Sequence, residues 1–402
     1  MTSAFDLLAA IDVVDPYPLW QSLLDAPPQI AEDGSFALVT RHADCAELLR
    51  HPDMSSDARN STHFRATMTE EELKRIEKRE VFLFRDPPVH TRLRRLVSKA
   101  FTPRQVQQLQ PFIEERTREL LDAAAERGRL ELVADLAYPL PVAVISELLG
   151  VPHEDHATFA GWSAVLAKSL DRLMTAATPE ELEENRIASD EFRAYFEQLA
   201  EQRRHDPRDD LLTALVQAEE AGDRLTMDDL TSTALLLLVA GHETTVNLIG
   251  NGMLALLRVP GLLERVRDKP QLAEGMVEEV LRLDPPVQMT MRTALKDIEV
   301  PGGTLRKGGS AVLLIAAANR DDREYDDVLT FEPGRDDSSH LSFSGGIHYC
   351  LGAPLARLEG RIVFAELARR LVNPRLGELT YRDNRVLRGP AVLEVGFDAL
   401  LP

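Results

Sequence analysis

The longest apolar stretch of the chain, residues 230–257, constrains the fold more than any other feature of the sequence. The helical pattern around it begins at Thr226 and ends before Pro260, and about 31 residues at about 1.5 Å each would form a helix of about 46 Å. Glu243 lies near the middle of this stretch. A carboxylate at the centre of a bilayer costs about 2.5–3.5 kcal/mol on insertion scales. The sequence therefore predicts a helix buried in a protein core and no membrane anchor.

The composition is that of an ordinary globular protein, with 44% hydrophobic and 28% charged residues among 402. It excludes a disordered, a collagen-like and a disulfide-rich chain. The 46 Lys and Arg against 66 Asp and Glu give a net charge of −20. Because such a surface repels phosphate backbones and anionic lipid, we expect no nucleic acid as a partner. Cys45 and Cys350 are far apart, and the start of the chain lacks the pattern of a signal peptide, which favours a cytoplasmic protein without disulfides.

The distribution of helical and strand patterns predicts the fold class. The first two thirds of the chain are mostly helical in pattern, whereas short strand patterns occur at 290–295, 298–300 and 311–315. A last helix is predicted over 353–371. Because strands and helices do not alternate, a doubly wound parallel sheet is excluded. We therefore predict a mainly α protein with a small β region, in one domain over residues 1–402.

Residues typical of helix ends mark further helices. Thr69 and Glu72 form a capping-box pattern at the start of a charged helix. The sequence Asp86-Pro87-Pro88 predicts another helix start, with proline at the first-turn positions that tolerate it. Residues 140–149 have a helical pattern that ends at Gly150.

A glycine-rich loop before the last helix contains the motif with the clearest chemical meaning. It has the pattern Phe-x-x-Gly-x-x-x-Cys-x-Gly from Phe343 to Gly352, and Cys350 comes just before the helix. Backbone amides and the helix dipole favour a thiolate at Cys350. Gly352 would let a flat molecule approach the backbone closely. On the cysteine alone, the alternative is a buried thiol beside a tight turn.

The whole pattern resembles the haem-ligand loop of the cytochrome P450 family. The resemblance implies a P450-like single large domain with a long central helix, and haem b (iron protoporphyrin IX) as the cofactor. It also implies that Cys350 is the axial thiolate ligand of the iron and that Phe343 and Gly352 belong to the cofactor site. Ser344 stands where the family usually has glycine, and we expect it to tighten the loop while the ligand is kept.

A Glu-x-x-Arg pair, Glu279 and Arg282, lies on one face of a predicted helix. By itself such a pair is equally typical of a solvated helix. With Arg335 it resembles the family's buried network of one glutamate and two arginines. Because buried charges are costly unless each is paired, we expect these three residues to form one structural network.

The segment from Asp86 to Arg94, Asp-Pro-Pro-Val-His-Thr-Arg-Leu-Arg, resembles the helix of the family that contacts haem. His90 and Arg94 are four residues apart on one helix face, and by resemblance they bind a haem propionate. Arg292 and His348 complete this set by the same resemblance. Without that context, an ordinary surface histidine is an equal interpretation of His90 and His348.

The centre of the long helix has the sequence Ala240-Gly241-His242-Glu243-Thr244-Thr245. By resemblance, Glu243 and Thr244 are the acid–alcohol pair that relays protons toward dioxygen, and Ala240 and Gly241 lie beside the haem. The structural alternative is a kink, because a mid-helix threonine can bond to the carbonyl four residues before it.

A dinucleotide-binding pattern, Gly-x-Gly-x-x-Ala, occurs at residues 250–255. It requires a surrounding βαβ unit, whereas this chain is helical in pattern on both sides, so we expect small residues that let another helix pack closely. Three alternative functions stay open at this point: a nucleotide-dependent dehydrogenase, a non-catalytic haem sensor or carrier, and a peroxide-using haem-thiolate peroxygenase. The acid–alcohol pair argues against the last.

The resemblance implies a monooxygenase that inserts one atom of O2 into a small, mostly hydrophobic organic substrate, by hydroxylation or epoxidation. No flavin or nicotinamide domain fits beside a haem domain in 402 residues, so a ferredoxin with an NAD(P)H-dependent ferredoxin reductase is the expected electron donor. The loop before Asp86 and the region 160–200 are expected to line the substrate pocket. Apolar residues expected there are Val239, Val287, Met289, Met291, Ala391 and Val392.

Basic residues recur on a second face of the helix that follows Asp86, namely Arg92, Arg95 and Lys99, with Arg104 nearby. They predict a local basic patch in an acidic surface, suited to an acidic ferredoxin. The alternative is that these cations only solvate an exposed helix.

Overall fold

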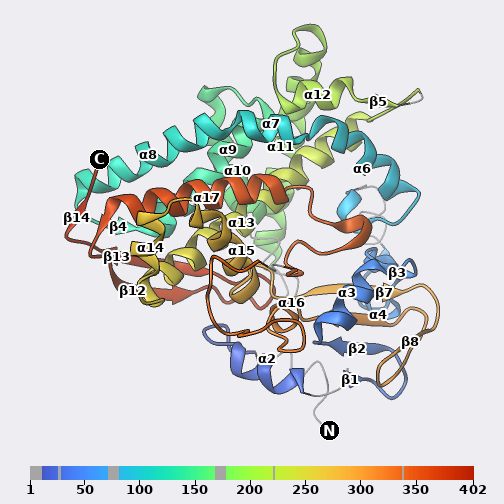
Figure 1. Cartoon of the computed structure of the whole chain (residues 1–402). Coiled ribbons are helices and arrows are strands. Elements are labelled where there is room, and N and C mark those ends of the chain that lie inside the picture. The colour runs from blue at the N-terminus through green and yellow to red at the C-terminus, as the bar shows by residue number, and fades with distance from the viewer. Residues whose placement is uncertain (1–10, 26–28, 71–80, 168–177, 221, 337–338) are drawn as a thin grey trace. The chain divides into compact units, whose positions relative to one another are not determined.

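The structure is a computed structural model that describes residues 11–402 apart from 26–28, 71–80, 168–177, 221 and 337–338 (Figure 1). The chain divides into two compact units, and each is described by itself. The first comprises Met1–Arg94, Leu281–Thr330 and Asp337–Cys350. The second comprises Arg95–Val280, Phe331–Asp336 and Leu351–Pro402.

The first unit contains the larger sheet and a few short helices. Its helices are α2 (Tyr17–Leu24), α3 (His42–Arg50), α4 (Thr62–Thr67) and α16 (Ile315–Ala318), with 3-10 turns η1 (Ala58–Asn60), η2 (Phe82–Phe84) and η5 (Gly346–His348). Its strands are β1 (Gln29–Ile30), β2 (Phe36–Val39), β3 (Met54–Ser55), β7 (Thr290–Ala294), β8 (Ile298–Val300), β9 (Gly303–Leu305) and β10 (Ser310–Leu313).

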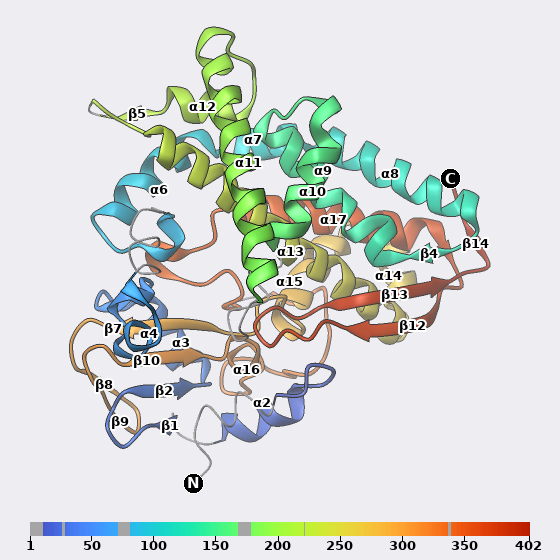
Figure 2. The ribbon, with the colours of Figure 1, turned by 180° about the vertical axis from the view of Figure 1, so that it is seen from behind.

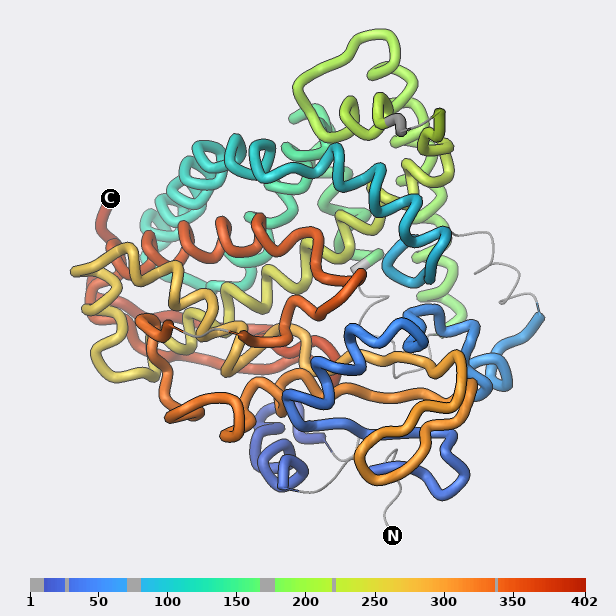
Figure 3. The backbone as a smooth tube through the Cα atoms, turned by 45° about the vertical axis from the view of Figure 1, so that its right-hand side comes forward, coloured from blue at the N-terminus to red at the C-terminus, as the bar shows by residue number. Residues whose placement is uncertain are grey.

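Five of these strands form one sheet in the order β1-β2-β10-β7-β3. Neighbouring strands are antiparallel except β2 and β10, which run parallel with Ala37 opposite Ala311. Every residue of β2 and β10 is buried, as expected of central strands with both faces covered. Figure 3 shows strands from the start of the chain (blue) beside strands from residues 290–313 (orange). The sheet thus positions β7, which carries Arg292.

The second unit is mainly helical, and boundaries between the units fall within α6 (Val89–Ala100) and near the end of α15 (Leu272–Leu283), between Val280 and Leu281. Its other helices are α7 (Pro103–Gln108), α8 (Gln110–Arg127), the π-helical turn η3 (Val133–Ala137), α9 (Pro139–Leu149), the 3-10 turn η4 (His153–Asp155), α10 (His156–Ala167), α11 (Pro179–His205), α12 (Leu211–Gln217), α13 (Met227–Arg258), α14 (Leu262–Asp268) and α17 (Ala353–Arg370). Its strands are β4 (Leu130–Glu131), β5 (Glu219–Glu220), β6 (Asp223–Arg224), β11 (Leu371–Val372), β12 (Arg375–Tyr381), β13 (Pro390–Gly396) and β14 (Ala399–Leu400). Figure 2 shows the hairpin of β12 and β13, to which β4 adds a third strand.

The long helix α13 forms the core of the second unit. Thr226 caps its N-terminus and forms a capping box with Asp229, as the sequence predicts. The helix packs against α9, α10, α11 and α17. Among the described residues it is the one helix long and apolar enough to cross a membrane, but 67% of its apolar window is buried inside the fold. That burial is typical of a core helix.

The structure confirms a mainly α fold with a small β region, and most predicted elements occur within one or two residues of their expected bounds. Three details differ. Pro87 and Pro88 precede α6 and do not occupy its first turn, Ile315 begins α16, and Leu371 begins β11. Glu72, half of the predicted capping box, lies outside the described residues, as does part of the region 160–200. One domain over the whole chain stays a prediction.

The dinucleotide-binding interpretation is wrong. Its glycines lie inside α13, and the residues before them are helical, so no βαβ unit surrounds them. A Cβ on Gly252 would lie 2.1 Å from the Phe364 ring of α17, and a Cβ on Gly250 would lie 2.5 Å from Pro390. The small residues therefore permit close packing, as the alternative expectation stated.

Candidate active site

Cys350 ends a tight loop in the first unit. Its backbone amide donates a hydrogen bond of 2.9 Å to the carbonyl of Phe343. Gly346 has a φ of 62°, and a Cβ there would lie 3.0 Å from the carbonyl oxygen of Leu49, so this turn requires glycine. The Cys350 side chain is half-buried and forms no disulfide. The loop therefore presents one thiol at a fixed point of the backbone.

Ser344 explains why a glycine suits this loop. Its φ is 62°, and this left-handed conformation costs a residue with a Cβ about 1–2 kcal/mol. The Ser344 hydroxyl also accepts a hydrogen bond of 3.3 Å from Nη2 of Arg292. Serine thus strains the loop and connects it to β7.

Four basic side chains lie together beside this loop, and we call them the cationic cluster: His90, Arg94, Arg292 and His348. The rings of His90 and His348 have centroids 4.3 Å apart. Nη2 of Arg94 donates a hydrogen bond of 2.5 Å to the carbonyl of Tyr349. These residues, widely separated in the chain, therefore lie together, and their binding of a haem propionate stays a prediction.

The cationic cluster is not ion-paired to any described carboxylate, although the charge of Asp86 partly opposes the effect of burial on the pKa of Arg292 and of His90. Within the part of the chain that is described, none of its members forms an ion pair with a carboxylate, and both ring nitrogens of His90 and Nδ1 of His348 are buried without a well-formed hydrogen bond. Burial, followed by the charge of Arg292, lowers the pKa of His348 to about 3. Burial also lowers the pKa of Arg292 to about 10. An anion that accepts hydrogen bonds would stabilise this cluster.

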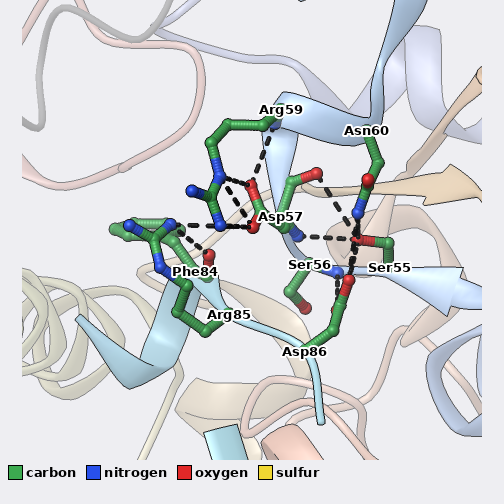
Figure 4. Close-up of polar contacts among 8 residues, drawn as sticks. All are labelled: Ser55, Ser56, Asp57, Arg59, Asn60, Phe84, Arg85 and Asp86. Atoms are coloured by element: carbon green, nitrogen blue, oxygen red, sulfur yellow. Dashed lines mark hydrogen bonds and ion pairs between the residues drawn. The ribbon is translucent and has the colours of Figure 1, made fainter. Parts of the chain in front are cut away.

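Asp86 links the segment before α6 to the residues around strand β3 (Figure 4). Its carboxylate accepts hydrogen bonds from the Ser55 hydroxyl (2.5 Å), the Ser56 amide (3.1 Å) and the Asn60 side chain (3.1 Å). Ser55 belongs to β3, where it pairs with Thr293 of β7. Asp86 therefore fixes the start of α6, with His90, against the strand that carries Arg292.

A second buried carboxylate, Asp57, holds the loop before α6 (Figure 4). It forms ion pairs with Arg59 and with Arg85, whose Nη1 lies 3.7 Å from Oδ2. Burial raises the pKa of Asp57, but hydrogen bonds from Arg59 and the charges of both arginines lower it overall. These contacts fix Arg85, which directly precedes Asp86.

The predicted acid–alcohol pair lies on α13 in the second unit. The Thr244 hydroxyl donates a hydrogen bond of 2.7 Å to the carbonyl of Ala240. This is the bond of the structural alternative, yet α13 continues without a break through it. Glu243 is only 4% exposed and forms an ion pair with Arg382, which follows β12.

His242, next to Glu243, is also buried. Its Nδ1 lies 2.8 Å from the Ser163 hydroxyl, and its ring contacts that of Tyr138 edge-on at 4.3 Å. Burial lowers the pKa of His242 to about 4, and the charge of Arg382 adds to this effect. His242 is therefore neutral near pH 7.

The predicted structural network is partly visible within each unit. In the second unit, Glu279 lies 3.4 Å from Nε of Arg335 and accepts a hydrogen bond of 2.8 Å from the amide of Glu332. In the first unit, fully buried Arg282 donates to the carbonyls of Val328 (2.6 Å) and Thr330 (3.0 Å). All three are thus paired within the fold and are not a solvated face. One network of all three stays a prediction.

The residues predicted to line the substrate pocket differ in exposure. Met289 is buried and Met291 is 43% exposed. The others are half-buried, as are Ala240 and Gly241: Val239, Val287, Ala391 and Val392. A cleft of about 610 Å³ in the second unit lies elsewhere, between α8, α15 and α17, and its lining is largely charged.

Comparison with known proteins decides the family. The family model for cytochrome P450 matches residues 37–371. The chain belongs to the cytochrome P450 family. This P450 is 39% identical to the cytochrome P450 monooxygenase PikC of Streptomyces venezuelae, over 95% of this chain and 91% of the relative. It is 37% identical to a vitamin D(3) 25-hydroxylase of Pseudonocardia autotrophica, over 96% of this chain and 95% of the relative.

Solved structures agree with this assignment. Ligand-free CYP164A2 of Mycobacterium smegmatis is 42% identical, with a TM-score of 0.86 over 98% of each chain. CYP109E1 of Bacillus megaterium in complex with testosterone is 32% identical, with a TM-score of 0.84 over 96% of this chain and 100% of the other. The P450 fold is therefore confirmed, and this P450 is a haem-dependent oxidoreductase that incorporates oxygen.

The cationic cluster fits the cofactor of the family. Haem carries propionate carboxylates, which accept hydrogen bonds, and the cluster includes buried ring nitrogens of His90 and His348 that have no hydrogen-bond partner among the described residues. Gly352 caps α17 with a φ of −79°, a conformation open to any residue. Backbone conformation therefore does not require glycine at that position, and close approach of a flat molecule there stays a prediction.

Sequence reasoning missed two features of this P450. Arg382, the partner of Glu243, is separated from it by 139 residues and belongs to no motif. Asp86 was recognised only as the start of a motif, whereas the structure gives its carboxylate three donors from the segment 55–60. The signal that could have indicated a cation partner is the carboxylate of Glu243 itself, since a charge in an apolar helix requires a counter-charge when it is buried.

Proposed function

We propose that this P450 is a haem-thiolate monooxygenase in which Cys350 is the axial ligand of the iron. The position of the cationic cluster beside the Cys350 loop carries this proposal. Burial lowers the pKa of Arg94, and the charge of Cys350 opposes that effect, so a thiolate and this guanidinium are close enough to stabilise each other. Haem, when bound, supplies the iron at which O2 is activated.

The residues of the chain would bind and orient the cofactor. His90, Arg94, Arg292 and His348 hold its propionates by charge-assisted hydrogen bonds. By resemblance to the family, Phe343, Gly352, Ala240 and Gly241 would also belong to the cofactor site, where small or flat side chains are required. The unpartnered nitrogens of His90 and His348 support this assignment, because buried polar groups without partners are rare in folded proteins.

Glu243 and Thr244 would deliver protons for cleavage of the O–O bond, which also favours O2 over peroxide as the oxidant. Thr244→Ala should then still bind substrate and accept electrons, while the product formed per NAD(P)H consumed falls by about tenfold. Peroxide release is the second measurement. Full coupling in this variant would leave Thr244 with only its hydrogen bond to Ala240.

The substrate would be a small, mostly hydrophobic organic molecule that is hydroxylated or epoxidised. Val239, Val287, Met289, Met291, Ala391 and Val392 supply apolar surface for it. The name of one relative includes vitamin D(3), and a solved relative is in complex with testosterone; both are mostly apolar organic molecules. Those names support the class of substrate.

Electrons would come from a cytoplasmic ferredoxin and its NAD(P)H-dependent reductase. Arg95, Lys99 and Arg104 are exposed and Arg92 is half-buried, so these residues are accessible as a basic patch. Arg95→Glu with Lys99→Glu should slow reduction by ferredoxin at low salt and leave the substrate-induced spectral change intact. Equal stopped-flow rates across a salt series would place the donor elsewhere.

The decisive experiment is the absorption spectrum of the reduced, CO-bound protein. The wild type should have the red-shifted band of thiolate ligation, and Cys350→His should lose the band and monooxygenation while some haem is kept. Cys45→Ala is the matched control, because Cys45 is the other cysteine of the chain, is buried and forms no disulfide. An unchanged spectrum in Cys350→His would contradict the assignment.

A further inference from the structure

A buried ion pair joins the centre of α13 to the hairpin of β12 and β13. Arg382 directly follows β12, and its Nη1 pairs with Oε2 of Glu243. The exposed fractions of the two side chains are 17% and 6%. Removing one partner of such a pair is costly, because it leaves the other as an uncompensated charge away from water.

The same hairpin follows one face of α13 beyond this pair. Glu243, Asn247 and Asn251 are spaced four residues apart and therefore share a helix face. Asn251 donates a hydrogen bond of 3.2 Å to the carbonyl of Arg388. A Cβ on Gly389 would lie 2.1 Å from Oδ1 of Asn247, so the backbone at Gly389 lies against the Asn247 side chain.

This contact ends at the segment assigned to the substrate pocket. Pro390 begins β13 and packs against Gly250 of α13. Ala391 and Val392 come next in the chain. One connection, residues 382–389, thus links the carboxylate of Glu243 to the strand that carries two of the apolar residues predicted to contact substrate.

No other described group near Glu243 replaces the arginine. His242 is neutral near pH 7, since burial and then the charge of Arg382 lower its pKa to about 4, and its Nδ1 is occupied by Ser163. Tyr138 is a neutral phenol whose pKa is raised by burial and then by Glu243. Within the residues described, Arg382 is therefore the cation that fixes Glu243.

We propose that Arg382 is a positioning residue for proton delivery, which holds the Glu243 carboxylate in place and ties it to the substrate-contacting strand β13. The inference rests on the proposed function of Glu243 as the acid of the acid–alcohol pair. Arg382 touches neither the cofactor nor the substrate in this role. It acts through Glu243 alone.

The test compares Arg382→Gln with Arg382→Lys and a control, Arg385→Gln. Arg385 lies in the same connection, but its partner Asp383 is 83% exposed. Arg382→Gln should lower the product formed per NAD(P)H consumed by about tenfold, as loss of a positioned acid would. Arg382→Lys should restore most of the coupling, and Arg385→Gln should behave as the wild type. Substrate-induced spectral changes should stay the same in all three.

A second measurement, which needs no turnover, detects the protonation of the Glu243 carboxyl group directly. A buried carboxylate without a counter-charge takes up a proton. Infrared difference spectra of the resting protein at neutral pH should therefore gain a protonated-carboxyl band in Arg382→Gln. The band should be absent from the double variant Glu243→Gln/Arg382→Gln, which carries neither charge and so tolerates the loss of the pair.

The Glu243→Gln variant separates this inference from the function on which it rests. If Glu243→Gln stays coupled, the proposed role of Glu243 is wrong. If Glu243→Gln uncouples but Arg382→Gln does not, the role of Arg382 is overturned and that of Glu243 stands. The inference requires that the double variant be no less coupled than Glu243→Gln alone, and additive losses would also overturn it. Should Arg382→Gln not fold, the Arg382→Lys variant and the double variant still decide between these outcomes.

Discussion

The cationic cluster of the first unit and the Glu243–Arg382 pair of the second unit differ in whether their charges have an ion-pair partner among the described residues. The cluster gathers four basic groups whose neighbouring carboxylate, Asp86, already accepts three hydrogen bonds. The pair buries one acid with one base. Gathering basic groups does not stabilise the folded chain, since burial and then the charges of Arg292, His90 and Arg94 lower the pKa of His348. An unbalanced cluster therefore marks a place for an external anion, whereas a balanced pair marks a geometry that the chain itself fixes.

The largest expected effect comes from removing one partner of a buried ion pair. Glu279 is 2% exposed and is paired with Arg335. Glu279→Ala should lower the free energy of unfolding by about 3–5 kcal/mol, because it removes the buried acid that pairs with Arg335, whose side chain is only 15% exposed. We expect little soluble holoprotein, measured as yield and haem content. Glu332→Ala is a control, since that acid is exposed and pairs with Arg265 at the surface. A normal yield from Glu279→Ala would mean that its charge is dispensable.

His242, next to Glu243, makes the stability of the fold depend on pH. The pKa of His242 is depressed to about 4 in the folded state and returns to its ordinary value in the unfolded chain. The unfolded state therefore binds more protons at acid pH, so this contribution to stability is complete above about pH 6.5 and is lost as the pH falls toward 4. Its full size is about 3 kcal/mol. Urea unfolding at a series of pH values should show a shallower acid limb in His242→Gln. An identical limb would assign the acid sensitivity to other groups.

Removing a member of the unbalanced cluster should affect the cofactor more than the fold. Arg292→Ala should weaken haem binding by about 10–100-fold, because a charge-assisted hydrogen bond contributes about 1.5–3 kcal/mol. The apoprotein should lose less stability than Glu279→Ala does, since no described carboxylate forms an ion pair with Arg292 and its removal strands no partner. Haem transfer to an acceptor protein and urea unfolding of the apoprotein measure the two effects. If the fold suffers as much as the cofactor affinity, the cluster is structural.

The sequence predicted elements and motifs that are local in the chain, and it failed where partners are distant. The bounds of α13 follow from Thr226 and Pro260, and the Cys350 loop follows from one motif, because capping and turn geometry depend on neighbouring residues. The Arg382 partner of Glu243 depends on where a hairpin 139 residues away packs, which no local pattern encodes. The chemistry of the cationic cluster was predicted from family resemblance, whereas its lack of balancing acids required the structure.

The smallest expected effect concerns Ser344, which connects the loop of Cys350 to the cationic cluster. Its left-handed backbone costs about 1–2 kcal/mol with a Cβ present. Glycine would remove that strain but would lose about 0.5–1 kcal/mol through the greater freedom of the unfolded chain. Serine adds the hydrogen bond from Arg292, worth about 0.5–1.5 kcal/mol. These terms nearly cancel, so Ser344→Gly should leave the free energy of unfolding within about 1 kcal/mol of the wild type. Ser344→Ala keeps the strain and loses the hydroxyl, so it should be less stable than Ser344→Gly by about 1 kcal/mol. Equal stabilities of the two variants would mean that the backbone of this loop relaxes when the contact with Arg292 is lost.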